Sequence, residues 1–222
     1  MKEKPILYKD IMVKAILAGN KTQTRREKGL EDINENPDDF VFFKSGISDS
    51  GKKMILLKDT KGKIAVYSNS PYGWIGDRLW VREAFKDTDD IGFVPDENTP
   101  RYLYKADDYM NEWKGWTPSI HMPRKASRIT LEIVDIRIER LTDISEQDAI
   151  AEGIEIFDNT EDGTFDLTNP DSYIARDYLD NDRYASTDNA ARSFLSLWQK
   201  INGIGSYIKN PWVWVIVFKR VM

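Results

Sequence analysis

Six consecutive polar residues, Lys21 to Arg26, form the densest group of chemically useful side chains in the sequence. The run reads Lys-Thr-Gln-Thr-Arg-Arg and follows a short apolar segment that ends at Gly19. A hydroxyl beside an ammonium group is one way to build a threonine nucleophile when no histidine is at hand. The lysine must then lose its proton near neutral pH, which burial can bring about. In this interpretation Lys21 and Thr24 carry the chemistry.

The same run also fits a structural interpretation. Lysine and arginine after a helix interact favourably with its C-terminal dipole, so the run is also typical of a solvated basic turn. If the segment is extended, Lys21, Gln23 and Arg25 point one way and the residues between them point the other. If it is partly turned, Lys21 and Thr24 meet on one side. Residue type and spacing leave these alternatives open.

Other catalytic residue types are scarce. The 222 residues include no cysteine and a single histidine, His121. This excludes a disulfide framework, thiolate metal sites and a cysteine nucleophile, and it leaves almost no material for a zinc site or a Ser-His-Asp triad. We therefore expect neither a metal nor a cofactor.

The charge of the chain is unevenly distributed. The net charge is −5, from 32 basic and 37 acidic side chains, whereas a dedicated phosphate-backbone binder is expected to be basic. Residues 152–188 hold 11 acidic and two basic residues, so the rest of the chain is about +4. No stretch approaches the roughly 20 apolar residues of a membrane span, and the N-terminus lacks the apolar region of a secretory signal. We predict a cytoplasmic protein without a membrane partner.

Two other segments mix aromatic and basic side chains. Trp74 precedes Arg78, and His121 precedes Arg124. Such a mixture can form a wall on which a base stacks. It is equally typical of a turn that leads into a core strand, with solvated arginines and a histidine that serves as a structural hydrogen-bonding residue.

The elements that must position these residues are short. Apolar periodicity and capping residues predict helices over residues 9–18, 141–153 and 189–202. Strands are predicted over residues 40–44, 54–58, 64–67, 78–83, 102–104, 127–141 and 211–221. The 127–141 strand changes its apolar phase near Val134, which predicts a bulge or a sharp bend.

These elements predict an α+β chain with one domain over residues 1–222. The simplest architecture is a small mixed β-barrel with flanking helices. Polar stretches at about 27–70 and 154–190 are interpreted as insertions that decorate it. The acidic second insertion is expected to contain a helix at 171–180.

The chain resembles the ASCH family, a branch of the PUA-like β-barrel superfamily. The segments that carry the resemblance are Ile16–Arg26, Gly76–Leu79, Ala149–Gly153 and Trp212–Lys219. Pro5-Ile6-Leu7 and Ser119–Arg124 are similar to segments of the longer phage and prophage ASCH-like proteins. The resemblance spans nearly the whole chain in the same order, and Lys-Thr-x-Thr-Arg after a helix and glycine is its most specific part.

This resemblance implies recognition of RNA or of a modified base. One small bacterial branch is similar to an amidohydrolase that removes acyl groups from N4-acylated cytidine. By motif position, its lysine, threonine and glutamate fall on Lys21, Thr24 and Glu152. In that scheme Thr24 attacks the amide carbonyl, Lys21 takes its proton and Glu152 assists the leaving amine. The two insertions could reshape or cover the pocket.

Three functions are compatible with these observations. The favoured one is a PUA-like pocket that binds a nucleoside or an RNA base, with or without hydrolysis of an amide on it. Its expected binding residues are Arg25, Arg26, Trp74, Arg78, His121 and Arg124. The second is a non-catalytic RNA-binding module whose phosphate contacts come from Lys21, Arg25, Arg26, Arg124, Lys125 and Arg128. The third is a phage accessory protein that acts through protein contacts.

Overall fold

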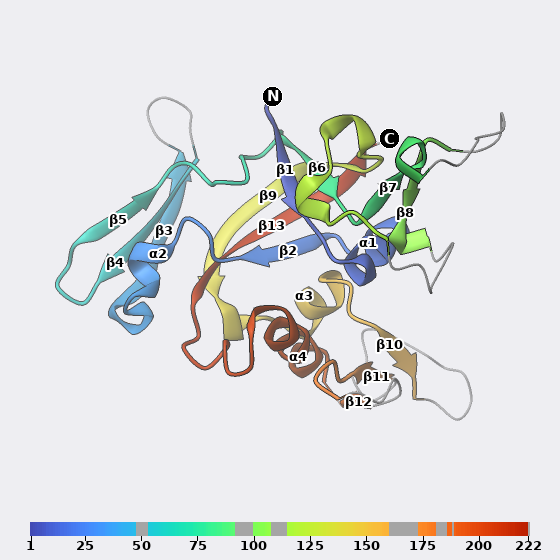
Figure 1. Ribbon diagram of the computed structural model, residues 1–222. Helices are drawn as coiled ribbons and strands as arrows, with labels where there is room; N and C mark the ends of the chain where they lie inside the picture. The colour runs from blue at the N-terminus through green and yellow to red at the C-terminus, as the bar shows by residue number, and fades with distance from the viewer. Residues whose placement is uncertain are drawn as a thin grey trace. The chain divides into compact units, whose positions relative to one another are not determined.

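Helices and strands are mixed along the chain, and strands predominate (Figure 1). The computed structural model describes residues 1–47, 53–91, 100–107, 115–159, 173–180, 186–187 and 189–221. In this part of the chain the strands form one five-stranded, two three-stranded and one two-stranded sheet, all open at their edges. The predicted α+β class is confirmed.

The elements are short, as their sequences predict. The helices are α1 Asp10–Leu17, α2 Glu31–Asn34, α3 Glu146–Ala151 and α4 Ala190–Asn202. The first eight strands are β1 Glu3–Leu7, β2 Gln23–Arg26, β3 Phe40–Ile47, β4 Lys53–Asp59, β5 Ile64–Tyr67, β6 Arg78–Arg82, β7 Phe85–Asp87 and β8 Tyr102–Tyr104. The others are β9 Thr130–Arg140, β10 Ile156–Asp158, β11 Tyr173–Arg176, β12 Ser186–Thr187 and β13 Trp212–Val221. None of the described helices is long and apolar enough to cross a membrane.

The chain divides into two compact units. The first comprises residues 1–19, 72–134 and 218–222, and the second comprises residues 20–71 and 135–217. Hydrogen bonding orders the strands of the largest sheet as β1-β6-β9-β13-β2, and β9 and β13 each have residues in both units. The expectation of one domain with two insertions stays a prediction.

In the first unit, β1 pairs with β6 in parallel, and β6 pairs with β9 in antiparallel fashion. Leu79 and Leu131 are directly opposite each other and both are fully buried. β7 and β8 form a separate antiparallel pair, in which Phe85 packs in a small apolar cluster with Met122 and Ala126. Helix α1 buries Met12, Val13 and Ile16.

In the second unit, β13 is buried along most of its length, as expected for a strand covered on both faces. It pairs with β2 so that Val215 is opposite Arg25 and Ile216 is opposite Thr24. Helices α3 and α4 pack against each other, and β3, β4 and β5 form an antiparallel sheet (Figure 1). β10, β11 and β12 form the other three-stranded sheet.

The predicted change of phase in β9 is confirmed. Leu131 and Ile133 are fully buried on one parity, and Ile136 and Ile138 are buried on the other. Val134, at the change, is 40% exposed. Because the buried positions change parity, the odd-numbered residues of β9 after residue 134 point away from the core, and these residues are polar.

Two local expectations were wrong. Residues 173–176 form strand β11, where a helix over 171–180 was predicted, because pairing with β10 and β12 overrides the weak helical pattern. Residues 27–39, for which no helix or strand was predicted, contain the short helix α2. Residues 160–172 of the predicted second insertion lie outside the described residues.

Candidate functional site

Helix α3 presents two carboxylates to the polar run that begins at Lys21. Ser145 caps the helix, because its Oγ accepts a hydrogen bond from the backbone N–H of Asp148 at 3.1 Å. Glu152 follows the last helical residue, and Gly153 continues the chain at a φ of 79°. Lys21 and Glu152 form an antiparallel β-bridge, beside which the Thr22 N–H donates to the carbonyl of Ala151 at 2.9 Å. This backbone pairing fixes Lys21 beside Glu152.

The ammonium group of Lys21 is buried and held by one residue on two sides. Its Nζ donates to Glu152 Oε2 and to the Glu152 backbone carbonyl, both at 2.7 Å. Only 2% of each residue is exposed. Burial, which outweighs the attraction of the Glu152 carboxylate, lowers the pKa of Lys21 below its ordinary value. Lys21 therefore loses its proton more readily than a solvated lysine does.

Arg25 is the second buried cation of this site. Its Nη1 donates to Glu152 Oε1 at 3.2 Å, and its Nη2 donates to Glu139 Oε1 at 2.5 Å and to Asp148 Oδ2 at 3.0 Å. The guanidinium also lies 5.6 Å from the ring centroid of Phe194 on α4. With 1% of its surface exposed, Arg25 has no room to contact a phosphate in this conformation.

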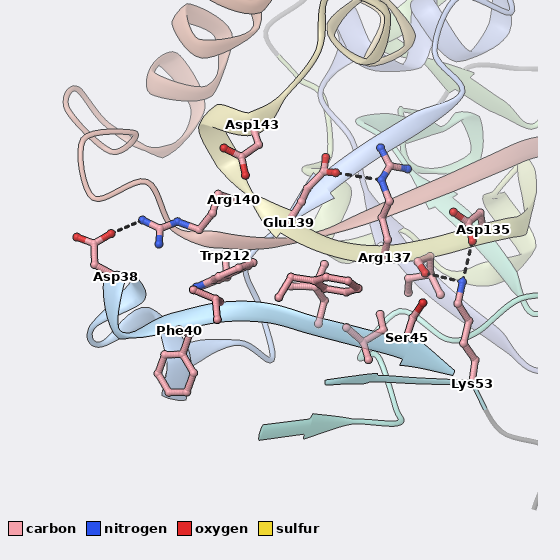
Figure 2. Close-up of a pocket in the computed structure, with 15 residues that line it drawn as sticks. Asp38, Phe40, Ser45, Lys53, Asp135, Arg137, Glu139, Arg140, Asp143 and Trp212 are labelled. Carbon is pink, nitrogen blue, oxygen red and sulfur yellow. Dashed lines mark hydrogen bonds and ion pairs between the residues drawn. The ribbon is translucent and has the colours of Figure 1, made fainter. Parts of the chain in front are cut away.

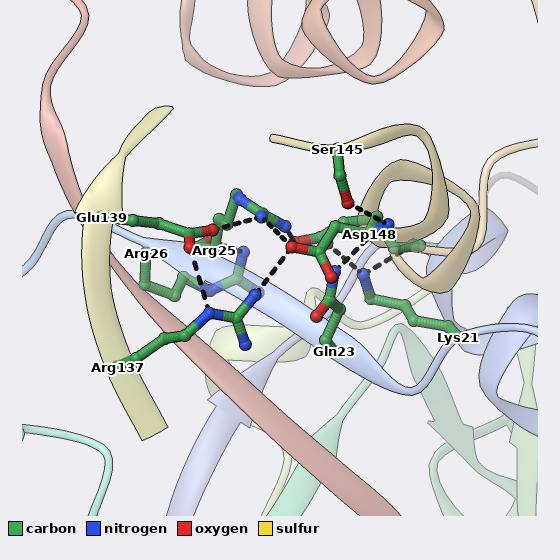
Figure 3. A network of polar contacts seen from close by, with 9 residues as sticks. Lys21, Gln23, Arg25, Arg26, Arg137, Glu139, Ser145 and Asp148 are labelled. Atoms are coloured by element: carbon green, nitrogen blue, oxygen red, sulfur yellow. Dashed lines mark hydrogen bonds and ion pairs between the residues drawn. The ribbon is translucent and has the colours of Figure 1, made fainter. Parts of the chain in front are cut away.

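Arg137 on β9 completes the network (Figure 3). Its Nε donates to Glu139 Oε2 at 3.0 Å and its Nη2 to Asp148 Oδ2 at 2.7 Å. Three cations, from Lys21, Arg25 and Arg137, are thus matched by three carboxylates. We call these six residues, Lys21, Arg25, Arg137, Glu139, Asp148 and Glu152, the charge network.

Thr24 lies apart from the charge network. Gln23 and Arg25 both reach Asp148, through its backbone carbonyl at 2.6 Å and its carboxylate respectively. Side chains alternate along a strand, so Thr24 between them points to the opposite face of β2. Its Oγ1 is buried and has no hydrogen-bond partner within the described residues. The structure thus brings Lys21 and Glu152 together, but it joins neither to the Thr24 hydroxyl.

The other predicted binding residues are dispersed. Arg26 is half-buried on β2, and its Nη1 donates to the carbonyl of Arg25 at 3.3 Å. In the first unit, Trp74 is in a turn where its backbone N–H donates to Asp77 Oδ2 at 3.1 Å. Arg78 is the first residue of β6. Exposure is intermediate for both Trp74 and Arg78.

His121 and Arg124, also in the first unit, are exposed and occupy two successive 3₁₀ turns. Arg124 Nε donates to Glu3 Oε2 at 3.0 Å, and its guanidinium lies 6.0 Å from the Trp80 ring. Arg128, another expected phosphate contact, is held by two bonds of 2.9 Å to the Glu83 carboxylate. Both arginines therefore already have carboxylate partners.

A pocket of about 730 Å³ lies in the second unit between β3 and the C-terminal half of β9 (Figure 2). Its apolar lining includes Phe40, Phe42, Ile55 and Trp212. The size is within the range of small-molecule sites in proteins. Phe42 is 53% exposed, so one aromatic ring at this pocket is open to contact with a ligand.

The polar lining of the pocket connects it to the charge network. Arg137 and Glu139 belong to both, and Asp135 accepts a bond of 2.9 Å from Lys53 on β4. Arg140 donates to Asp38 Oδ1 at 2.6 Å and lies 5.4 Å from the Trp212 ring. Sequence reasoning missed this pocket, although the phase change in β9 was a signal that the odd-numbered side chains after Val134 face a different environment.

Metal-binding groups do not stand out in the described part of the chain, where no cluster of three His, Asp or Glu side chains could hold an ion. No protein-family model, curated protein or solved structure matches this chain. The site is therefore interpreted from its own geometry.

Proposed function

We propose that this protein binds a nucleoside or a single RNA base in the pocket between β3 and β9. The observation that carries the proposal is a cavity of about 730 Å³ in which an exposed phenylalanine, Phe42, is close to fixed polar groups. A nucleobase offers an aromatic face and an edge of hydrogen-bond donors and acceptors, so it needs both kinds of wall.

Arg137 is the best-placed residue to read the base edge. Its Nε and Nη2 are held by Glu139 and Asp148, while no hydrogen bond is assigned to its Nη1 within the described residues. An anchored guanidinium keeps its geometry when a ligand arrives, which reduces the entropy lost on binding. Acidic side chains at the pocket, such as Asp143, can accept from an exocyclic amine.

We also infer that the fold is of the PUA-like, ASCH type. The support is the strand order β1-β6-β9-β13-β2 together with the change of buried parity along β9, since small barrels use such phase changes to turn a strand around a corner. The motif residues of the resemblance, Lys21 and Glu152, are adjacent in space although 131 positions apart in sequence.

Titration calorimetry with cytidine, uridine and N4-acetylcytidine tests the binding proposal. We expect Phe42→Ala to weaken binding about tenfold, because stacking of one base on an aromatic ring contributes about 1–3 kcal/mol. The matched control is Val66→Ala on β5, which is 54% exposed and does not line the pocket. No heat of binding with any nucleoside, or equal affinity in Phe42→Ala and the wild type, would contradict the proposal.

A second candidate function is hydrolysis of an N4-acyl amide on cytidine. The observation in its favour is the buried Lys21, whose lowered pKa suits a general base. In this conformation Lys21 Nζ donates to Glu152, and the Thr24 hydroxyl has no hydrogen-bond partner within the described residues. Lys21 must therefore move away from Glu152 before it can take a proton from Thr24. Hydrolysis therefore requires a rearrangement that simple binding does not.

Thr24→Val is the cleanest test of hydrolysis. The Thr24 hydroxyl has no partner within the described residues, so an apolar residue of the same shape is expected to leave stability nearly unchanged. Release of acetate from N4-acetylcytidine by the wild type and by Thr24→Ser, with none from Thr24→Val, supports the mechanism. Equal turnover in Thr24→Val rules out Thr24 as the nucleophile, and nucleoside binding without any turnover leaves binding as the function.

A further inference from the structure

Strands β3, β4 and β5 form one sheet (Figure 1). One face of this sheet carries exposed apolar and basic side chains. On the opposite face, Ile55 and Leu57 of β4 are buried. Strand pairing places Lys58 of β4 between Val41 and Ile64, and Leu56 between Lys44 and Val66. Because paired residues share a face, these six side chains are together on the side away from Ile55 and Leu57. We call this side the lysine face.

Phe43 is the aromatic residue of the lysine face. It occupies a bulge in β3, where the register shifts between Phe42 and Lys44. The ammonium groups of Lys44 and Lys58 lie 5.8 Å and 6.0 Å from the centre of its ring, which fixes the ring on their side of the sheet. The residue is 46% exposed, so part of it is open to a further contact.

The lysines of this sheet differ from the arginines elsewhere in the chain. Residues 40–67 contain six lysines and two aspartates, a net charge of +4 in a chain whose total is −5. Within the described residues, Lys44, Lys58, Lys61 and Lys63 are exposed and form no ion pair. Arg25, Arg124 and Arg128, by contrast, are bound to carboxylates.

We propose that the lysine face binds single-stranded nucleic acid. A base stacks on Phe43 while Lys44 and Lys58 contact the neighbouring phosphates, with further phosphate contacts from Lys61 and Lys63 in the β4–β5 turn. An aromatic ring flanked by ammonium groups matches the alternation of base and phosphate along a strand. Lysines without carboxylate partners release counterions from the strand at no cost in broken ion pairs.

Of the residues assigned to the lysine face, Val41 alone also lines the nucleoside pocket. Phe42 lines the pocket, whereas its neighbour Phe43 belongs to the lysine face. The lysine face would therefore bind a strand whether or not the pocket holds a base. Two variants one position apart, Phe42→Ala and Phe43→Ala, separate the two proposals.

Fluorescence anisotropy of labelled 12-nucleotide oligo(U) and oligo(dT), titrated with the full chain from 50 to 300 mM salt, is the test. The wild-type affinity should fall as the salt concentration rises. The slope of log K against log salt concentration should decrease in magnitude by about 0.7 for each contacting lysine that is removed. We expect Lys44→Gln/Lys58→Gln to lower the slope by about 1.4. Phe43→Ala should weaken binding about five- to a hundredfold at constant slope.

The controls are an exposed lysine away from the sheet and the neighbouring aromatic residue. Lys209→Gln should bind oligonucleotides as the wild type does. Phe42→Ala should weaken nucleoside binding about tenfold and keep the wild-type salt slope, because it removes no charge. Thermal melting of each variant confirms that it is folded. Equal affinity for oligo(U) and oligo(dT) would mean that the protein contacts only bases and phosphates. A preference for oligo(U) would indicate a further contact to the 2′-hydroxyl. Both results support the proposal.

Three results would overturn it. One is the absence of binding to either oligonucleotide at 50 mM salt. Another is binding that Lys44→Gln/Lys58→Gln and Phe43→Ala leave unchanged. The third is tighter binding to poly-glutamate or to phosphatidylserine vesicles than to the oligonucleotides, which would assign the lysine face to an acidic protein or to a lipid surface instead.

Discussion

The two groups of basic residues in the second unit have opposite electrostatic settings. In the charge network, Lys21, Arg25 and Arg137 are matched by an equal number of carboxylates, and Lys21 and Arg25 are almost completely buried. On the lysine face, Lys44 and Lys58 are exposed and have no carboxylate partner within the described residues. Both groups look alike in a sequence, as basic residues among apolar ones.

This difference separates a cation that holds the fold from one that is available to a ligand. A buried ammonium has lost its hydration, so its partner cannot be removed without a large penalty. An exposed lysine keeps its hydration and makes only weak, salt-sensitive contacts within its own chain. The Lys-Thr-x-Thr-Arg-Arg run therefore contributes mainly to internal contacts in this conformation. The accessible lysines are Lys44, Lys58, Lys61 and Lys63.

The largest expected effect comes from breaking the charge network at Glu152. Glu152→Gln leaves Lys21 and Arg25 without their shared carboxylate, so we expect a loss of about 3–5 kcal/mol in the free energy of unfolding, measured by urea denaturation. The control is Glu35→Gln, an exposed carboxylate just after α2, which should change stability by less than about 0.5 kcal/mol. Similar stability of the two variants would mean that the network does not hold the fold.

The second effect is a pH dependence of stability that comes from the buried Lys21. Burial lowers the pKa of Lys21 in the folded protein, and the unfolded chain keeps the ordinary value near 10.4. Between these two values the unfolded chain binds more protons, so Lys21 makes the free energy of unfolding rise with pH, by at most about 1.4 kcal/mol per unit. Its contribution is complete above about pH 10.4 and falls as the pH drops through the lowered pKa.

Lys21→Met isolates this contribution, because all other titrating groups are shared with the wild type. The stability difference between wild type and Lys21→Met should shift in favour of the wild type from pH 7 to pH 10. Lys58→Gln, which removes an exposed lysine, is the matched control for this comparison. A flat difference for Lys21→Met would place its pKa at the ordinary value and remove the electrostatic contrast between the two groups.

Local rules were sufficient for most of the elements but not for the site. Helices α1 and α4 and the phase change in β9 each depend on a few neighbouring residues, and the structure bears them out. Within the charge network, Lys21 and Arg25 contact carboxylates 114 to 131 positions away, and no local pattern encodes such contacts. The adjacency of Lys21 and Glu152 was expected from the family resemblance, whereas Glu139 and Arg137 were not singled out.

The pocket and the lysine face were beyond sequence reasoning for a different reason. Residues 27–70 were interpreted as an insertion. Strands were predicted within it, but the sequence did not indicate what packs against either face of the sheet that they form. Only the strand register shows that Phe42 and Phe43, neighbours in sequence, serve opposite faces across a bulge. Helix 171–180 was wrong because long-range pairing of β11 decided its conformation.

The smallest expected effect is the change in the free energy of unfolding when an exposed lysine of the lysine face is replaced. It contrasts directly with the large effect expected for Glu152→Gln. Lys58→Gln removes an exposed ammonium that contacts only the Phe43 ring among the described residues, so the free energy of unfolding should change by less than about 0.5 kcal/mol. Thermal and urea denaturation measure this change. A loss as large as that of Glu152→Gln would show that Lys58 is structural. A stable Lys58→Gln variant with a reduced salt slope in oligonucleotide binding is expected, because a cation without a carboxylate partner acts on a ligand and not on the fold.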